Sequence, residues 1–358
     1  MKRNFALSRS GPFWNALGSI MYGANSVLLL TAVNRFLGVE ASGVFGIAFT
    51  TSQLLWIVGI FGVGQFQMTD YREQYSFSAY FKTKIISCLI MAVCAVFTCL
   101  GLGFSREKSI LTLLLTVYMM AHAVSDLFQN RFFQLDRLDL SGKCLFYRTL
   151  FSLIFFVLAL WLTRNLIISA AILALANISA LFLFSYFPCK KFLPVPSAVP
   201  RTEIFSLVKA CMPLFISTFL MNYLMQLPKY AIEKQNSDVM QGIFNMIFMP
   251  AQVINLISSF IYRPMLKPLS NAISSGDKKT AVYLIGRQFA IIGGFTLVCC
   301  LGAWLCGVEV LGWFYGADLS GQRLPLLPVP VLFRSCLAIY QLRQQVPSRS
   351  FFRHVELC

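Results

Sequence analysis

Long apolar runs separated by short polar segments make up most of this chain. The first two runs, residues 13–37 and 43–66, are joined by a polar turn at residues 38–42. Each run is longer than the about 20 apolar residues that a helix needs to cross a bilayer. The pattern therefore predicts that the chain opens with a hairpin of two membrane-spanning helices.

Seven more runs of the same kind follow and predict an all-α, polytopic membrane helix bundle. Six helices make a first bundle over residues 1–190, and a proline-rich basic segment at 191–204 is the expected cytoplasmic linker. A partial second bundle of three helices, helices seven to nine, fills residues 205–321, and Pro250 predicts a kink in the eighth helix. The seven further helices are expected at residues 85–104, 110–128, 145–162, 166–187, 205–227, 240–262 and 281–306.

Composition supports a membrane location. Of the 358 residues, 57% are hydrophobic and 12% are charged, whereas a soluble domain carries about 25% charged residues. The chain has 30 basic and 14 acidic residues. This surplus is typical of the positive-inside rule, because the basic residues lie in short loops and not in an aromatic-lined patch that would bind nucleic acid.

The distribution of basic residues predicts the orientation. Alternate loops and the N-terminal segment hold 19 Lys and Arg residues, with Lys84 and Arg148 counted among them, and the opposite loops hold six. We therefore expect the N-terminus in the cytoplasm. The first apolar run is too long for a signal peptide, so it is expected to be retained as the first helix.

The last segment, residues 322–358, departs from the pattern. Pro325, Pro328 and Pro330 interrupt a short apolar run, and arginines follow among serines and glutamines. We interpret this tail as the product of a shifted reading frame or an interrupted gene. The alternative is a genuine short tail with a re-entrant or interfacial segment.

Polar residues inside the spans mark the candidate site, because they are costly in hydrocarbon and usually face a cavity, water or a partner helix. Three helices each carry such residues at spacings that share one face. We predict a central cavity that binds sugar hydroxyls through amides and phosphate through cations. Hydrogen bonds between helices are the alternative for each residue. The predicted lining residues are Asn15, Tyr22, Asn25, Arg35, Gln53, Gln65, Asn222, Gln226, Lys229, Asn245, Gln252 and Asn255.

Two further features concern helix ends and helix contacts. Asp126 and Arg131 lie near the predicted cytoplasmic end of the fourth helix and are candidates for a gate, with plain solvation as the alternative. Gly59, Gly62 and Gly64 in the second helix permit close packing or bending, and packing is the favoured role.

No enzymatic site is expected. The chain has no phosphate-binding glycine loop, no paired carboxylates within a span and no Cys-x-x-Cys motif. With only His122 and His354 present, a histidine-based metal site is not expected either, and no cofactor is predicted. Most of the eleven cysteines lie in apolar runs, where they behave as small hydrophobic residues.

Five short segments carry a family resemblance: residues 15–19 (Asn-Ala-Leu-Gly-Ser), 34–38 (Asn-Arg-Phe-Leu-Gly), 41–45, 61–70 and 227–233. The first four resemble the opening of the Wzx-like lipid-linked oligosaccharide flippases, and the last resembles that family's loop after helix seven. These proteins are the polysaccharide-transport branch of the multidrug/oligosaccharidyl-lipid/polysaccharide exporter superfamily. The resemblance covers about residues 10–320 and implies two six-helix bundles around a central cavity, an alternating-access cycle and a polyprenyl-diphosphate-linked glycan as cargo. Here only three helices of the second bundle are clear, so that bundle is read as truncated.

The function predicted from the residues and the resemblance is the flipping of a lipid-linked oligosaccharide across the plasma membrane for cell-surface polysaccharide synthesis. Lys229 or Arg35 would attract the diphosphate. The expected partners are the lipid-linked glycan and membrane lipid, with a polysaccharide polymerase and a glycosyltransferase as candidate protein partners. The alternatives are a multidrug exporter of the same superfamily, a membrane enzyme such as a polymerase or acyltransferase, and a remnant that does not transport.

Overall fold

The structure is a computed structural model that describes residues 11–70, 74–135, 137–193, 199–234, 237–248 and 278–316. All regular secondary structure in these ranges is helical, which confirms the predicted all-α membrane bundle. The chain divides into two compact units, residues 1–242 and 243–358. The predicted boundary at residues 191–204 remains a prediction.

Unit 1 contains nearly all of the described helices. It also holds the first residues of a helical segment that begins at residue 238. In unit 2 the structure describes the helical residues 243–248 and one long helix, α11 (Lys278–Tyr315). The helices of unit 1 are α1 (Gly11–Leu37), α2 (Val39–Ile60), α3 (Val63–Thr69), α4 (Phe77–Gly101), α5 (Arg106–Gln134), α6 (Leu138–Thr163), α7 (Leu166–Ala180), η1 (Leu181–Tyr186), α8 (Phe187–Lys190) and α9 (Arg201–Glu233).

The helices of unit 1 expose apolar side chains and bury polar ones, as expected of a protein surrounded by lipid. On α4 the residues Leu89, Phe97 and Leu100 are exposed, while Thr83 and Ser87 are buried. Seven helical segments between Gly11 and Glu233 are long and apolar enough to span a membrane. They correspond to the first seven helices expected from the sequence.

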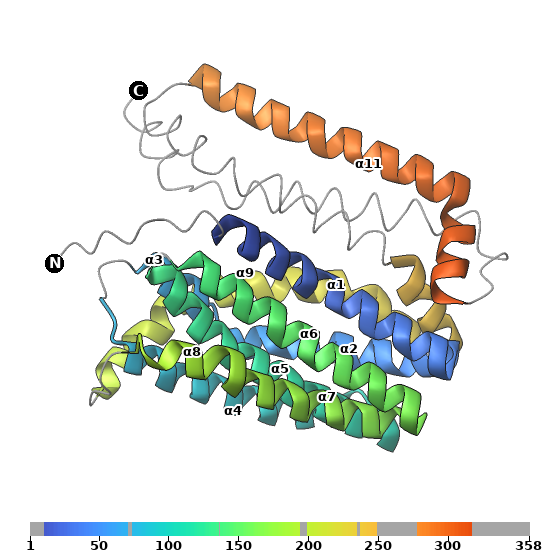
Figure 1. The fold of residues 1–358 in the computed structure, drawn as a ribbon, viewed down its shortest axis with the longest axis horizontal. Helices are drawn as coiled ribbons and strands as arrows, with labels where there is room; N and C mark the ends of the chain where they lie inside the picture. The colour runs from blue at the N-terminus through green and yellow to red at the C-terminus, as the bar shows by residue number, and fades with distance from the viewer. Residues whose placement is uncertain are drawn as a thin grey trace. The chain divides into compact units, whose positions relative to one another are not determined.

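The helix α5 is the centre of unit 1. It packs against α2, α3, α4, α6 and α7, whereas α9 packs against α2, α3 and α4 (Figure 1). Helices α1, α4, α6 and α9 begin at one end of the unit, which we call the starting end. Helices α2, α5 and α7 begin at the other, the opposite end; contacts between Gly11 and Leu138 and between Phe36 and Arg164 mark the two ends.

The helices α1 and α6 cross at two glycines. A Cβ atom at Gly18 would collide with the backbone carbonyl of Gly142, and one at Gly142 would collide with the backbone of Trp14. Small residues allow this close approach of two backbones, which is a common way for helices to associate in membranes.

Gly142→Ala is therefore expected to destabilise the protein by about 1–3 kcal/mol, because the added methyl group must push two helix backbones apart. The measurement is the thermal unfolding of the purified protein in detergent. Gly101→Ala is the matched control, because a Cβ atom at Gly101 meets nothing within 4 Å. Equal unfolding temperatures for the two variants would show that the crossing tolerates a side chain.

Several helices begin earlier or end later than the apolar runs. Ser76 and Ser105 accept hydrogen bonds from Ala79 N (3.1 Å) and Lys108 N (3.3 Å) and so place the starts of α4 and α5 in polar sequence. The predicted end of the seventh helix at residue 227 is wrong, because α9 continues through Pro228 to Glu233.

Part of the eighth predicted helix and the tail fall outside the described residues. The eighth helix is described only from residue 238 to 248, so the kink expected at Pro250 lies beyond it. The ninth predicted helix is covered by α11, which is longer than expected at both ends. Residues 322–358 lie outside the described ranges, and their interpretation is unchanged.

Candidate functional site

The second predicted span is broken inside the bundle. The helix α2 ends at Ile60, and α3 begins at Val63. Between them, Phe61 and Gly62 have φ angles of 47° and 69°, which lie in the left-handed region. The prediction of one continuous helix to residue 66 is wrong here, because hydropathy alone does not register a change in backbone direction. Gly62 therefore allows the chain to turn, while Gly59 and Gly64 lie in close packing contacts.

Side chains of α4 satisfy the backbone carbonyls that this break exposes. The Nζ atom of Lys84 donates to the carbonyl of Ile60 (3.3 Å), and the hydroxyl of Ser87 donates to that of Gly59 (2.7 Å). A broken helix inside a membrane needs such partners, because water is not there to provide them. Lys84 is 0% exposed, so the break has a buried cation at the C-terminal end of α2.

A carboxylate completes this arrangement at the start of α3. Asp126 Oδ2 lies 3.5 Å from Lys84 Nζ and accepts a hydrogen bond from Asn130 Nδ2 (3.0 Å). The Gly64 position, in the first turn of α3, lies directly against Asp126 and Asn130. The cation thus lies at the negative end of one helix dipole, and the anion lies beside the positive end of the next.

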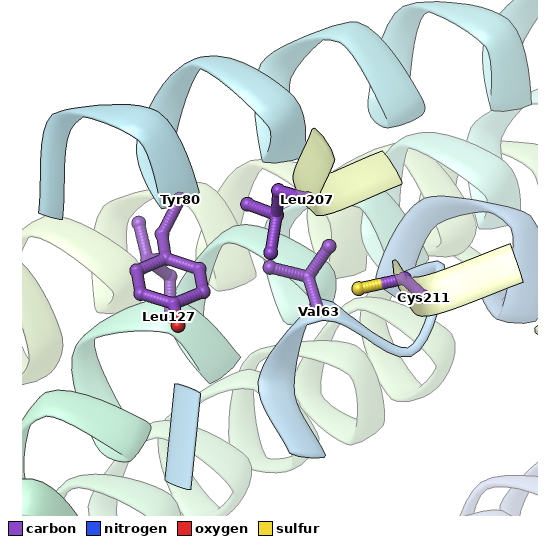
Figure 2. Packing of buried hydrophobic residues seen from close by; sticks show 5 residues of the cluster. All are labelled: Val63, Tyr80, Leu127, Leu207 and Cys211. Carbon is purple, nitrogen blue, oxygen red and sulfur yellow. The ribbon is translucent and has the colours of Figure 1, made fainter. Parts of the chain in front are cut away.

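Apolar packing fixes the break from the other side. Val63 meets Leu207 and Cys211 of α9, with Tyr80 of α4 and Leu127 of α5 beside them (Figure 2). The Nε2 amide of Gln67 donates to the carbonyl of Leu127 (3.1 Å) and joins α3 to α5. The short helix α3 is thus positioned by three neighbouring helices.

A second polar cluster lies in the interior of the bundle around Tyr118 of α5. Asn25 Nδ2 donates to its hydroxyl (2.8 Å), and Asn177 Nδ2 donates to its backbone carbonyl (2.9 Å). The ring of His122 lies 4.7 Å from that of Tyr118 and 5.5 Å from that of Tyr22, measured between ring centroids. Of the predicted cavity residues, Tyr22 and Asn25 therefore lie together.

A third site joins α9 to α2. Lys229 is 7% exposed, and its Nζ donates to the hydroxyl of Thr50 (3.0 Å). The hydroxyl of Tyr230 donates to that of Thr51 (3.2 Å), and Gln226 is buried one turn earlier on α9. Lys229 and Gln226, which were predicted to share one face, are thus both buried near the end of α9.

Charged side chains also hold both ends of α9. At the starting end, the carboxylate of Glu203 accepts a hydrogen bond from Ser76 N (2.8 Å). At the opposite end, Lys108 Nζ lies 2.7 Å from Glu233 Oε1 and 2.6 Å from Asp238 Oδ1. One cation from the start of α5 thus serves two carboxylates, one at the end of α9 and one in the turn of helix that follows.

The remaining predicted residues are more dispersed. Arg35 and Gln65 are exposed, whereas Asn15 and Gln53 are half-buried. The amide of Asn222 donates to the carbonyl of Thr218 in its own helix (2.8 Å), and Arg131 donates to Gln134 (3.2 Å). Asn245 is buried in the segment 243–248, and Gln252 and Asn255 lie outside the described residues. The role of all these residues in a cavity remains a prediction.

Sequence reasoning missed the buried cations Lys84 and Arg148, which it counted as loop residues. Both lie inside helices and are buried, Lys84 in the second turn of α4 and Arg148 in the third turn of α6. Their positions could have indicated that they are helical. Lys84 lies one residue before an apolar run, and Arg148 lies inside one. A serine or glycine that can begin a helix precedes each of them. Within the described ranges, no group of three or more His, Cys, Asp or Glu residues could hold a metal ion.

Residues 10–270 match the model of a family described as "Polysaccharide biosynthesis protein", which confirms the resemblance seen in the sequence. No curated protein matches the chain at a significant level.

Solved structures of MATE transporters share the fold. An outward-facing multidrug resistance MATE family transporter of the MOP superfamily has a TM-score of 0.59 and 11% identity, over 93% of this chain and 81% of that chain. An inward-facing structure of such a transporter has a TM-score of 0.57 and 13% identity, over 90% and 81%. The MATE multidrug transporter DinF-BH, solved as a complex, has a TM-score of 0.55 and 13% identity, over 96% and 87%.

Proposed function

The chain belongs to the polysaccharide biosynthesis protein family, and it shares its fold with MATE transporters. We therefore propose that it moves a lipid-linked oligosaccharide across the plasma membrane. The head group, joined to a polyprenyl chain through a diphosphate, is taken from the cytoplasmic side while the lipid tail stays in the bilayer. In this proposal the N-terminus and the starting end face the cytoplasm. In this proposal a glycosyltransferase acts before transport, and a polysaccharide polymerase acts after it.

The observation that supports this cargo is the charge of the buried interior. Among the described residues, the buried charged side chains are Lys84, Arg148, Lys229 and Asp139, so three of the four are cationic. Cationic side chains attract the diphosphate of the head group, whereas cationic drugs need carboxylates. The same observation therefore favours an anionic cargo over multidrug export.

The helix α9 is the element whose movement would open the path. Its polar contacts with the first six spans lie near its two ends. Between them α9 makes apolar contacts, such as Leu207 and Cys211 with Val63 and the stacked rings of Phe61 and Phe215 (centroids 4.5 Å apart). Alternating access requires one end to separate while the other stays closed. Two contacts would break in turn: the hydrogen bond between Glu203 and Ser76, and the ion pair between Lys108 and Glu233.

Lys229→Ala is expected to reduce transport at least about tenfold, because a hydrogen bond between a phosphate and a charged group contributes about 1.5–3 kcal/mol. The assay uses proteoliposomes that carry a fluorescent polyprenyl-diphosphate-linked oligosaccharide, whose glycan is trimmed by an added glycosidase only in the outer leaflet. The rate at which protected glycan becomes accessible reports flipping.

Lys234→Ala is the matched control for charge, because Lys234 is exposed five residues further along. The second test variant is Arg35→Ala, at the exposed end of α1. Unchanged transport in both Lys229→Ala and Arg35→Ala would remove these residues from diphosphate recognition. Wild-type proteoliposomes that flip no faster than empty liposomes would reject the proposed function itself.

A further inference from the structure

Arg148 is a buried cation without a described partner. It lies in the third turn of α6 and is 2% exposed. Its Nε and Nη1 atoms make no hydrogen bond, and no carboxylate of the described chain lies within ion-pair distance of it. A guanidinium stays protonated in a protein, so it cannot avoid the cost of burial by releasing its proton. Some counter-charge is needed in the folded protein.

The carboxylate whose charge acts on Arg148 is already engaged. Asp126 is the one carboxylate of the described chain whose charge acts on Arg148, and it forms the ion pair with Lys84 and the hydrogen bond with Asn130. Two buried cations therefore share a single carboxylate, which is itself 32% exposed. The interior has an excess of one positive charge at this place.

Other unsatisfied polar atoms gather in the same cluster. Both ring nitrogens of His122, which is 2% exposed, lack hydrogen-bond partners among the described residues, and the charge of Arg148 acts on this ring. Trp56 Nε1 is a further buried donor without a described partner, and its ring lies 6.4 Å from that of Tyr22. Guanidinium, imidazole and indole N–H groups are all donors to anions. The Oδ1 atoms of Asn25 and Asn177 also lack partners and would accept from a water molecule.

We propose that the first bundle holds a resident monovalent inorganic anion of the chloride class between Arg148 and His122. A single negative charge balances the excess cation. The rings of the cluster are in contact, with centroids 4.7 to 6.4 Å apart, so a monatomic ion is favoured over a bulkier phosphate or sugar acid. Arg148 is also one of the buried cations that support the proposed cargo. The site does not involve Lys229, and chloride binding is measured without any cargo, so the two proposals can fail separately.

The test uses the full chain purified in detergent and exchanged into sodium gluconate. Radioactive chloride is then titrated at constant ionic strength, and thermal unfolding is followed in parallel. We expect saturable binding of one chloride per chain. The unfolding temperature should rise by about 2 °C for each tenfold increase in chloride above the dissociation constant. Bromide is expected to compete with chloride, and gluconate is not.

Arg148→Met is expected to lose chloride binding and to unfold at the same temperature in chloride and in gluconate. Arg106→Met, an exposed arginine at the start of α5, is the matched control and should keep the full chloride response. If Arg148→Met does not fold, Arg148→Lys keeps the charge and should bind chloride with about tenfold lower affinity. The proposal is overturned if the wild-type protein binds no chloride and unfolds alike in both salts, or if Arg148→Met binds chloride as the wild type does.

Discussion

Lys84→Met is expected to lower the free energy of unfolding by about 2–4 kcal/mol, which is a large part of the stability of a typical protein. The methionine keeps the apolar stem but removes the donor to the Ile60 carbonyl (3.3 Å) at the end of α2. It also removes the cation beside Asp126 (3.5 Å). Chemical unfolding of the purified protein, followed by tryptophan fluorescence, measures the loss.

The control for Lys84→Met is Lys82→Met, an exposed lysine two residues earlier on the same helix, with an expected change within about 0.5 kcal/mol. The double variant Lys84→Met/Asp126→Asn should recover part of the lost stability, because it leaves no lone charge at the break. If Lys84→Met were as stable as Lys82→Met, the carbonyls at the break would have to be satisfied in another way.

Lys108→Ala is expected to release the end of α9 at the opposite end of the bundle. Without the shared cation, Glu233 and Asp238 lose contacts of 2.7 and 2.6 Å and repel each other. A charge-assisted hydrogen bond contributes about 1.5–3 kcal/mol, so amide hydrogen exchange near Glu233 should be about 10- to 150-fold faster. Hydrogen-exchange mass spectrometry on the peptides from both ends of α9 measures this change.

Only the opposite end should respond to Lys108→Ala, because Glu203 and Ser76 at the starting end keep their hydrogen bond (2.8 Å). Arg106→Ala, two residues before Lys108 on the exposed surface, controls for loss of a charge in α5. Exchanging the charges in Lys108→Glu/Glu233→Lys should restore part of the protection. Exchange that is unchanged in Lys108→Ala would show that the ion pairs do not hold α9 in place.

Hydropathy was enough to locate the spans of unit 1, because apolar side chains must cover the lipid-facing surface of every helix. It could not place the helix ends, since polar turns such as those at Ser76 and Ser105 continue the helix outside the apolar run. The seventh helix was also expected to end before Pro228, because proline usually ends a helix in water, yet Pro228 lies inside α9. A helix without competing water keeps its remaining hydrogen bonds around a proline.

The candidate site was predicted only in part, because most of its contacts join residues far apart in the sequence. Tyr22 and Asn25 share a face of α1 by helical spacing, so their proximity could be predicted. By contrast, Lys229 meets Thr50 across 179 positions, and Lys108 meets Glu233 across 125. No local pattern contains such pairs. The break at Gly62 was hidden for a different reason, since glycine in an apolar run signals close packing as often as a turn.

The lipid-facing surface of α4 also defines the membrane that suits this protein. Its exposed apolar side chains begin at Phe81 and end at Leu100, a length of about 29 Å at the helical rise of 1.5 Å per residue. The hydrocarbon core of a typical bilayer is about 30 Å thick. Upright insertion therefore leaves almost no hydrophobic mismatch on this side. In a thinner bilayer, the lipids would have to stretch around α4 or the helix would have to tilt. Bilayer thickness is therefore expected to affect the tilt of the whole bundle.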